Sequence, residues 1–183
     1  MKKYIKSNIV TPDGEDLGTR IRVASDPSTR LSTLEALAKD DTVSVKYAVL
    51  KNPSTPEMLR KSIKISKKYA RVSYRVYLDI DAENKLYFDK DAYKLILQDE
   101  LNARGILLTS FAGEDELCEQ YTCDTSDIYG VSFTCEGVCS HVEHGLEWVE
   151  NAIRDTNGSL NYDLAGIKLY RSINNGSTEV VIT

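Results

Sequence analysis

The sequence has no long hydrophobic run, and this absence argues first against the membrane classes. Its 183 residues contain no apolar stretch near the roughly 20 residues that a membrane-spanning helix needs. The opening MKKYIKSNIVTPDGEDLG has no apolar core and no small-residue cleavage site, so we expect no secretory signal. We therefore expect a cytoplasmic protein in a reducing compartment.

Familiar catalytic and nucleotide-binding motifs are also missing. The sequence holds no G-x-x-x-x-G-K-[ST], G-x-G-x-x-G, G-x-S-x-G or H-E-x-x-H pattern. The segment GVSFTCEG lacks the aromatic signature of an RNA-recognition motif. The net charge of −5 argues against a duplex-DNA binder with a wholly basic surface, but not against a local basic patch. We therefore expect a binding protein rather than an enzyme.

What is present is a globular composition, 42% hydrophobic and 28% charged, arranged in two parts. Up to residue 68 the apolar residues recur at helical spacing, and from residue 69 short alternating runs typical of strands appear. We therefore predict a helical subdomain over 1–68 and a mixed domain over 69–183.

The first part repeats itself, because DPST at 26–29 is matched by NPST at 52–55. In each copy we expect a helix to end at Asp26 or Asn52, since the proline that follows forbids its continuation, and Ser or Thr to cap the next helix. The stretch DPST…LEALAKDDTVSVKYAVLKNPSTPEML resembles the variant leucine-rich repeat over roughly residues 17–65. That resemblance implies paired helices that serve as a scaffold or binding surface. A plain helical subdomain is the alternative.

The second part alternates strands and helices. One expected helix is capped by Asp89 or Asp91 and ends at Gly105, and another lies in EHGLEWVENAIRDTNG. The expected strands are RVSYRVYLDID, ILLTSFAG, DIYGVSFTCEG, AGIKLYRSI and STEVVIT. The order βαβ, insertion, βαβ and a last strand is the split βαβ order of a ferredoxin-like sandwich. The predicted fold class is thus α+β: a helical repeat-like subdomain followed by a ferredoxin-like domain with an acidic, cysteine-containing insertion.

A basic stretch, RKSIKISKKYARVSYR, joins the two parts without an acidic residue. Such a stretch attracts a phosphate backbone, and the interleaved tyrosines can stack on bases. The alternative is a solvated helix end that runs into a strand. The candidate nucleic-acid-binding residues are Lys61, Lys64, Lys67, Lys68, Arg71 and Arg75.

Every cysteine and histidine of the protein lies between Cys118 and His144. Zinc prefers four thiolate or imidazole ligands, so this clustering favours a structural zinc site. Disulfides and free thiols are the alternatives, and a catalytic pair of Cys139 with a histidine is a further, weaker one. The candidate ligands are Cys118, Cys123, Cys135 and Cys139, with His141 and His144 as alternatives.

The insertion GEDELCEQYTCDTSD is acidic. In size and charge balance the whole chain is similar to anti-CRISPR proteins, the phage or mobile-element inhibitors of RNA-guided nucleases. That similarity implies protein binding to a Cas9-type nuclease, with the acidic loop occupying a basic channel. The alternative is a zinc-containing regulator that contacts nucleic acid. The candidate partner-binding residues are Glu114, Asp115, Glu116, Glu119, Asp124 and Asp127.

Overall fold

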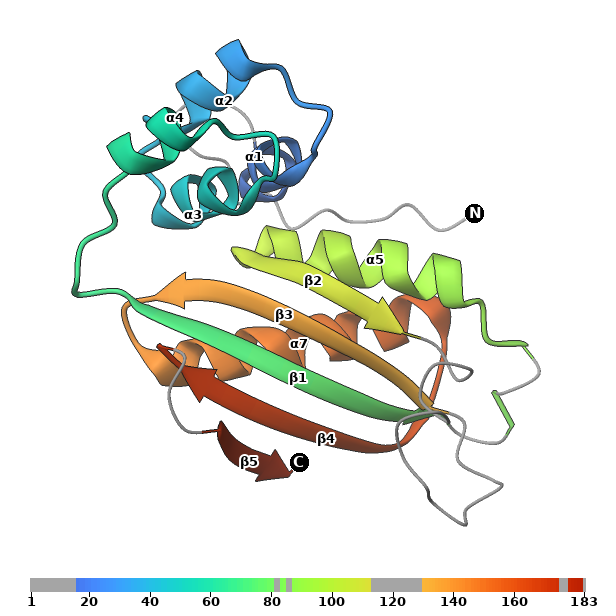
Figure 1. Ribbon diagram of the computed structural model, residues 1–183. Coiled ribbons are helices and arrows are strands. Elements are labelled where there is room, and N and C mark those ends of the chain that lie inside the picture. The colour runs from blue at the N-terminus through green and yellow to red at the C-terminus, as the bar shows by residue number, and fades with distance from the viewer. Residues whose placement is uncertain (1–15, 81–82, 85–86, 113–129, 175–177, 183) are drawn as a thin grey trace.

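A computed structural model of the chain describes residues 16–80, 83–84, 87–112, 130–174 and 178–182. The described elements confirm the predicted α+β class (Figure 1). None of the described helices has the length and apolarity that crossing a membrane requires. The helices are α1 (Leu17–Ser25), α2 (Leu31–Leu37), α3 (Val43–Lys51), α4 (Glu57–Ser62), α5 (Lys90–Ala103) and α7 (Val142–Leu160). The strands are β1 (Ala70–Ile80), β2 (Ile106–Ala112), β3 (Gly130–Cys139), β4 (Leu164–Ile173) and β5 (Thr178–Ile182).

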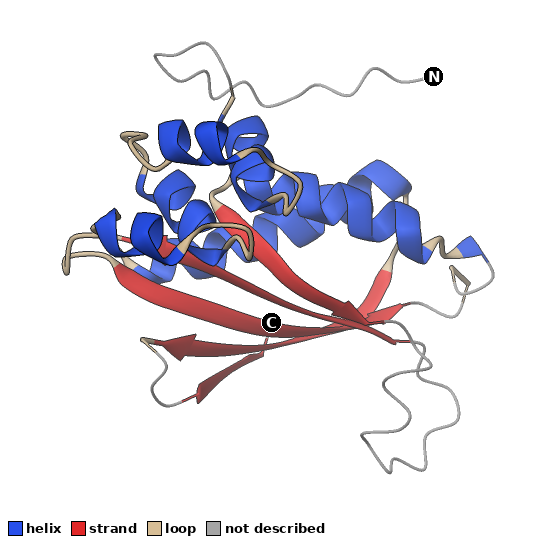
Figure 2. Ribbon diagram, turned by 45° about the horizontal axis from the view of Figure 1, so that its top comes forward, coloured by secondary structure: helices blue, strands red, loops and turns tan. Residues whose placement is uncertain are grey.

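The strands form one sheet in the order β2-β3-β1-β4-β5. Each pair of neighbours is antiparallel, so β1 lies at the centre between β3 and β4. Figure 2 shows the sheet as a layer with the helices gathered mainly on one side of it. Helices α5 and α7 pack against the same face of the sheet, which we call the covered face.

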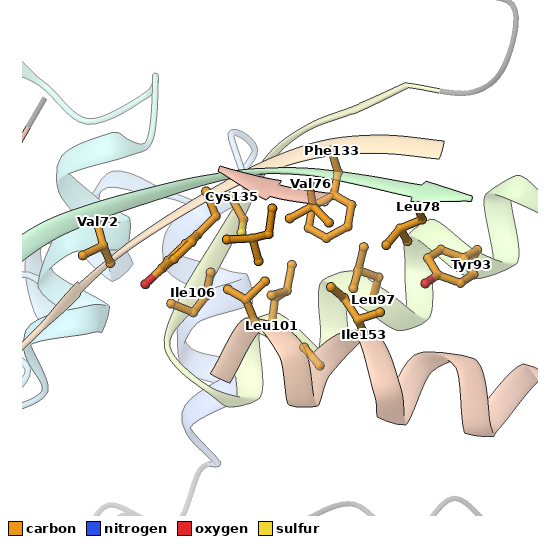
Figure 3. Packing of buried hydrophobic residues seen from close by; sticks show 14 of the residues in the cluster. Val72, Val76, Leu78, Tyr93, Leu97, Leu101, Ile106, Phe133, Cys135 and Ile153 are labelled. Carbon is orange, nitrogen blue, oxygen red and sulfur yellow. The ribbon is translucent and has the colours of Figure 1, made fainter. Parts of the chain in front are cut away.

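The main core lies between the covered face and the two long helices. Alternate residues of β1 point into it, from Val72 to Leu78, because successive strand side chains point to opposite faces. Helix α5 contributes Leu97 and Leu101, and Figure 3 shows these side chains meeting those of the strands. All of these residues are at most 1% exposed, so this layer contributes most of the apolar burial.

The N-terminal helices pack against the sheet rather than standing apart from it. Leu107 of β2 and Val138 of β3 belong to a second buried cluster together with residues of α1 and α3. Both point away from the covered face, so α3 covers one end of the opposite face. Helix α1 lies beside the end of α5, where a Cβ on Gly18 would come within 3.3 Å of Ala103. The helical segment therefore straddles the β2 edge of the sheet.

The two DPST and NPST segments make the same local hydrogen bonds. The Asp26 and Asn52 side chains each accept from the backbone N–H two residues on, at 2.8 Å in both cases. Thr29 and Thr55 each donate to a carbonyl six residues back, Val23 O at 2.6 Å and Val49 O at 2.7 Å. The predicted helix ends are therefore confirmed, with Asp26 and Asn52 as the C-caps of α1 and α3.

The predicted caps of the following helices are wrong. The N-cap residues are Arg30 for α2 and Pro56 for α4, and neither makes a side-chain cap. The threonines are already engaged with the preceding helix, where they satisfy carbonyls that its end leaves open. Asn52 also makes two hydrogen bonds that Asp26 does not make. Its amide donates to Ala24 O and Asp26 O at 2.8 Å and so links the two copies.

Helix α5 begins and ends where the sequence predicts. Asp89 is its N-cap, and its carboxylate accepts from the backbone N–H groups of Asp91 and Ala92. Gly105 follows the C-cap with φ of 80°, a left-handed conformation that glycine adopts without a Cβ penalty. A Cβ at Gly105 would also lie 2.7 Å from Ser44 Oγ, so the turn sits tightly against α3.

Candidate binding surface

The face of the sheet opposite α5 and α7 is the surface that the described helices leave most open, and we call it the uncovered face. In Figure 1 helix α7 lies behind the sheet, so the uncovered face of β1 and β4 is turned toward the reader. Strand β1 places Arg71, Ser73, Arg75 and Tyr77 on it, because these residues alternate with the buried ones. The two arginines are exposed.

The basic stretch runs from α4 into this face. Ile63, Ile65 and Tyr69 pack against the second buried cluster and hold the connection in place. The lysines between them are exposed, and Lys68 Nζ lies 5.1 Å from the ring centre of Tyr69. The predicted residues on this continuous run are Lys61, Lys64, Lys67 and Lys68 before the sheet, then Arg71 and Arg75 on it.

Lys61 and Arg60 of the stretch also interact with neighbouring polar groups. Lys61 forms an ion pair of 3.5 Å with Glu57, but both side chains are about 70% exposed, so the pair contributes little. Arg60 has a structural role, since its guanidinium donates to Asn52 O at 2.6 Å and Thr55 O at 2.9 Å. These bonds satisfy carbonyls that follow α3, so we do not count Arg60 in the binding surface.

Strand β4 adds residues that the sequence analysis missed. Tyr170 lies opposite Arg75, and Lys168 lies opposite Tyr77, so both belong to the uncovered face. The rings of Tyr77 and Tyr170 meet edge to face, with centres 5.7 Å apart. The signal for them is the alternation in GIKLYRSI, but assigning them to the same face as Arg75 requires the register between β1 and β4.

Glu136 of β3 also lies on the uncovered face, and its negative charge is balanced by residues of α3. Glu136 Oε1 lies 2.8 Å from Lys51 Nζ, and Tyr47 donates its hydroxyl to Glu136 Oε2 at 3.1 Å. Burial, and then the charge of Glu136, raise the pKa of Tyr47, so the phenol stays protonated. Helix α3 therefore neutralises Glu136 where it covers the end of the uncovered face.

Cys135 and Cys139 lie on β3, where both are buried on the covered face. Burial raises the pKa of the Cys135 thiol. It also raises the pKa of Cys139, although a backbone hydrogen bond from Gly145 and the charge of Arg171 act in the opposite direction. A nucleophilic thiol must be a thiolate, and the raised pKa values of these two free thiols oppose that state at neutral pH. Both thiols are free.

His141 and His144 are exposed at the start of α7, with ring centres 5.2 Å apart. His141 is the N-cap residue of the helix and makes no side-chain cap. Within the residues that the structure describes, no three His, Cys, Asp or Glu side chains are grouped to hold a metal ion. Cys118 and Cys123 lie outside those residues, so the four-cysteine zinc site stays a prediction.

Tyr74 shares the covered face with the cysteines. Its side chain is 1% exposed, and its hydroxyl has no hydrogen-bond partner in the part of the chain that the structure describes. A Cβ on Gly145 of α7 would lie 2.5 Å from that hydroxyl and 3.5 Å from Cys139 Sγ. Helix α7 approaches the sheet this closely because residue 145 has no side chain. The corner between Tyr74, Cys139 and α7 is therefore tightly packed.

The predicted acidic loop lies outside the described residues. Its six candidate residues are Glu114, Asp115, Glu116, Glu119, Asp124 and Asp127. The described part thus assembles the basic half of the predicted sites and extends it across the sheet, while the acidic half stays a prediction. Comparisons with protein-family models, with curated proteins and with solved structures find nothing that matches this chain.

Proposed function

We propose that the protein is a non-enzymatic inhibitor that binds a larger nucleic-acid enzyme through its charged surfaces. The supporting observation is that exposed charge is unevenly distributed over the two sides of the sheet. On α7, behind the sheet in Figure 1, Glu143 and Glu147 are exposed and Glu150 is half-buried, and helical spacing places them along one stripe that ends at the exposed Arg154. Glu143 also forms an ion pair of 3.2 Å with Arg171. The uncovered face and the stretch that leads to it carry exposed lysines and arginines instead.

The most concrete partner for such a molecule is a Cas9-type RNA-guided nuclease. These enzymes hold the guide–target heteroduplex in a positively charged channel, which an acidic surface complements. Opposite charges steer encounter and raise association rates, so an inhibitor of this kind captures its target quickly. In this proposal the stripe on α7 and the predicted acidic loop face the channel. The protein is then an anti-CRISPR protein of phage or mobile-element origin that acts in the cytoplasm of a bacterial host.

A cleavage assay with a purified Cas9-type nuclease tests this proposal. We expect the protein to slow cleavage of a target duplex, and we expect Glu147→Lys with Glu150→Lys to weaken inhibition by about tenfold or more. Glu35→Lys is the matched control, because Glu35 is an exposed glutamate on α2, away from α7. Unchanged cleavage at large excess of the wild-type protein would remove the proposal for that enzyme.

Two features of the architecture support the finer fold assignments that we propose. The order β2-β3-β1-β4 with two helices on one face is that of a ferredoxin-like sandwich, to which β5 adds a strand at the edge. The matched hydrogen bonds at Asp26 and Asn52 support a pair of repeat units in α1–α4. Neither assignment implies a reaction.

A zinc-containing regulator that contacts nucleic acid is the second candidate. The observation that favours its nucleic-acid part is the continuity of the basic stretch with the arginines of β1. Elemental analysis of the purified protein tests its zinc part. One zinc per chain would support the cysteine site, and a folded, metal-free sample would exclude it.

A further inference from the structure

Cations on the uncovered face stand beside aromatic rings. Along β1, Arg71 and Arg75 are four residues apart, which is about 13 Å in a strand. The neighbouring strand places Tyr170 directly beside Arg75 and Lys168 directly beside Tyr77. Two cation–aromatic pairs therefore lie side by side across the β1–β4 pairing, each with one member on either strand.

Cations outnumber acidic side chains on this face, where Asp79 lies near the far end of β1 and Glu136 lies on β3. Arg71, Arg75 and Lys168 are exposed, and none of them forms an ion pair within the described ranges. Glu136, by contrast, is held by Lys51 and Tyr47 at the end that α3 covers. The face thus attracts an anion, and the lysines at 64, 67 and 68 extend that attraction beyond the start of β1.

Between the charged groups the face carries small hydroxyl side chains. Ser73 lies next to Arg75 along β1, and Thr134 and Ser132 of β3 lie opposite Arg75 and Tyr77. Hydroxyls donate and accept hydrogen bonds, so those of the two serines suit both phosphate and base edges, whereas the Thr134 hydroxyl already bonds to Thr109 Oγ1 at 2.7 Å and Ser110 Oγ at 2.6 Å. No bulky side chain of β3 blocks access to the arginine from that side, since its residues opposite Arg75 and Tyr77 are small.

A ligand that offers both phosphates and accessible base faces matches this combination of cations, rings and hydroxyls better than a duplex or an acidic protein does. A duplex keeps its bases stacked inside, so it would use the cations but not the rings. Unpaired bases expose faces that stack on tyrosine while the backbone follows a positive surface. An acidic protein segment would likewise leave the rings without a stacking partner.

We infer that the uncovered face, with the basic stretch that leads to it, is a binding platform for single-stranded nucleic acid. Arg71, Arg75 and Lys168 bind phosphates, and Tyr77 and Tyr170 stack on bases. The inference goes beyond the proposed nuclease partner, because the platform binds an oligonucleotide with no nuclease present.

Fluorescence anisotropy with labelled twelve-nucleotide oligo-dT and oligo-U tests the inference. We expect binding that weakens steeply as salt is raised from 50 to 200 mM, as phosphate contacts require, with about 10-fold or greater loss for a site with several contacts. A duplex of the same length should bind more weakly, because its bases cannot stack on the tyrosines. The two oligonucleotides separate a DNA ligand from an RNA ligand, since a contact to the 2′-hydroxyl favours only oligo-U.

Substitutions on the uncovered face test whether the oligonucleotide binds there. Arg75→Glu with Lys168→Glu should weaken binding by about 10-fold or more and flatten its salt dependence. Tyr170→Ala should weaken binding by about fivefold or more while keeping the salt dependence, because it removes a stacking surface and no charge. The control is Arg154→Glu, since Arg154 is an exposed arginine on α7 on the other side of the molecule.

Three results would overturn the inference. The first is the absence of oligonucleotide binding by the folded protein at 50 mM salt. The second is an equal loss of binding in Arg154→Glu and in the sheet variant, which would indicate nonspecific attraction. The third is displacement of the oligonucleotide by poly-glutamate at the same charge concentration as oligo-dT, which would assign the face to acidic proteins. None of these measurements contains a nuclease, so their failure is separate from that of the proposed inhibition.

Discussion

Val76 and Tyr77 are neighbours in β1, yet one is fully buried in the core beneath α5 and α7 and the other lies on the uncovered face beside Tyr170. The same contrast holds along the strand, where Tyr74 is buried and Arg75 is exposed. One face of the sheet therefore holds the fold together, and the other is free to carry charge. Substitutions on the two faces should have separable effects, and each prediction below tests that separation.

Removing an aromatic side chain from the covered face should give the largest loss of stability. Phe133 of β3 is 1% exposed and belongs to the main core, so Phe133→Ala should lower the free energy of unfolding by about 3–5 kcal/mol. Arg75→Ala, on the other face, should change it by no more than about 0.5 kcal/mol. Guanidinium denaturation of both variants measures the contrast, and similar losses would contradict the assignment of the two faces.

A substitution at Asn52 tests how the two copies of the helical segment are held together. Asn52→Ala should cost about 2–3 kcal/mol, because the buried carbonyl of Ala24 loses its donor and the bond that joins Asn52 to Asp26 O is lost. Asp26→Ala is the matched control in the other copy, where the exposed side chain bonds only to Ser28, and should cost less than about 1 kcal/mol. Equal costs in urea denaturation would show that the link between the copies contributes nothing.

The close approach of α7 to the covered face should appear as an energetic coupling between Gly145 and Tyr74. Gly145→Ala should cost about 1–2 kcal/mol, because its Cβ would meet the Tyr74 hydroxyl. Tyr74→Phe alone should be neutral or slightly stabilising, since the buried hydroxyl has no partner among the described residues. In the Tyr74→Phe background, Gly145→Ala should gain up to about 1 kcal/mol, the usual preference for alanine in a helix. Additive effects in the double-mutant cycle would contradict this packing.

The covered face should also make the protein sensitive to alkali. Burial raises the pKa of Cys135 above its ordinary value near 9.0, so the folded state keeps a proton that the unfolded state releases. The stabilisation is complete below that value and is lost as the pH rises above it, by about 1 kcal/mol between pH 9 and pH 10 for this thiol. Urea denaturation across that range measures the slope. A slope that stays the same in Cys135→Ala would assign the effect to other groups.

Local signals in the sequence predicted much of the fold. Both ends of α5 were predictable at Asp89 and Gly105, because capping and the left-handed turn depend on residues next to each other in the chain. The prolines after Asp26 and Asn52 marked the ends of α1 and α3 for the same reason. The caps predicted at Thr29 and Thr55 were wrong, since a hydroxyl has two helix ends within reach and sequence does not choose between them.

The candidate surface was only half predictable. Arg71 and Arg75 stood out because the basic stretch is continuous in sequence. Lys168 and Tyr170 join them only through the antiparallel register of β4 with β1, across more than ninety residues of chain, and a shift of one residue would turn both to the covered face. Pairing of that kind is fixed by the whole core rather than by local sequence.

The most direct test of the two-face account is ultraviolet cross-linking of a bromodeoxyuridine-substituted oligonucleotide, followed by mass spectrometry of the linked peptides. Tyr87, off the sheet between β1 and α5, is 77% exposed, more than Tyr77 or Tyr170. A chain that bound nucleic acid without a defined site would therefore react there first. The account predicts cross-links in the β1 and β4 peptides at Tyr77 and Tyr170, and cross-links concentrated at Tyr87 or at Trp148 of α7 would contradict it.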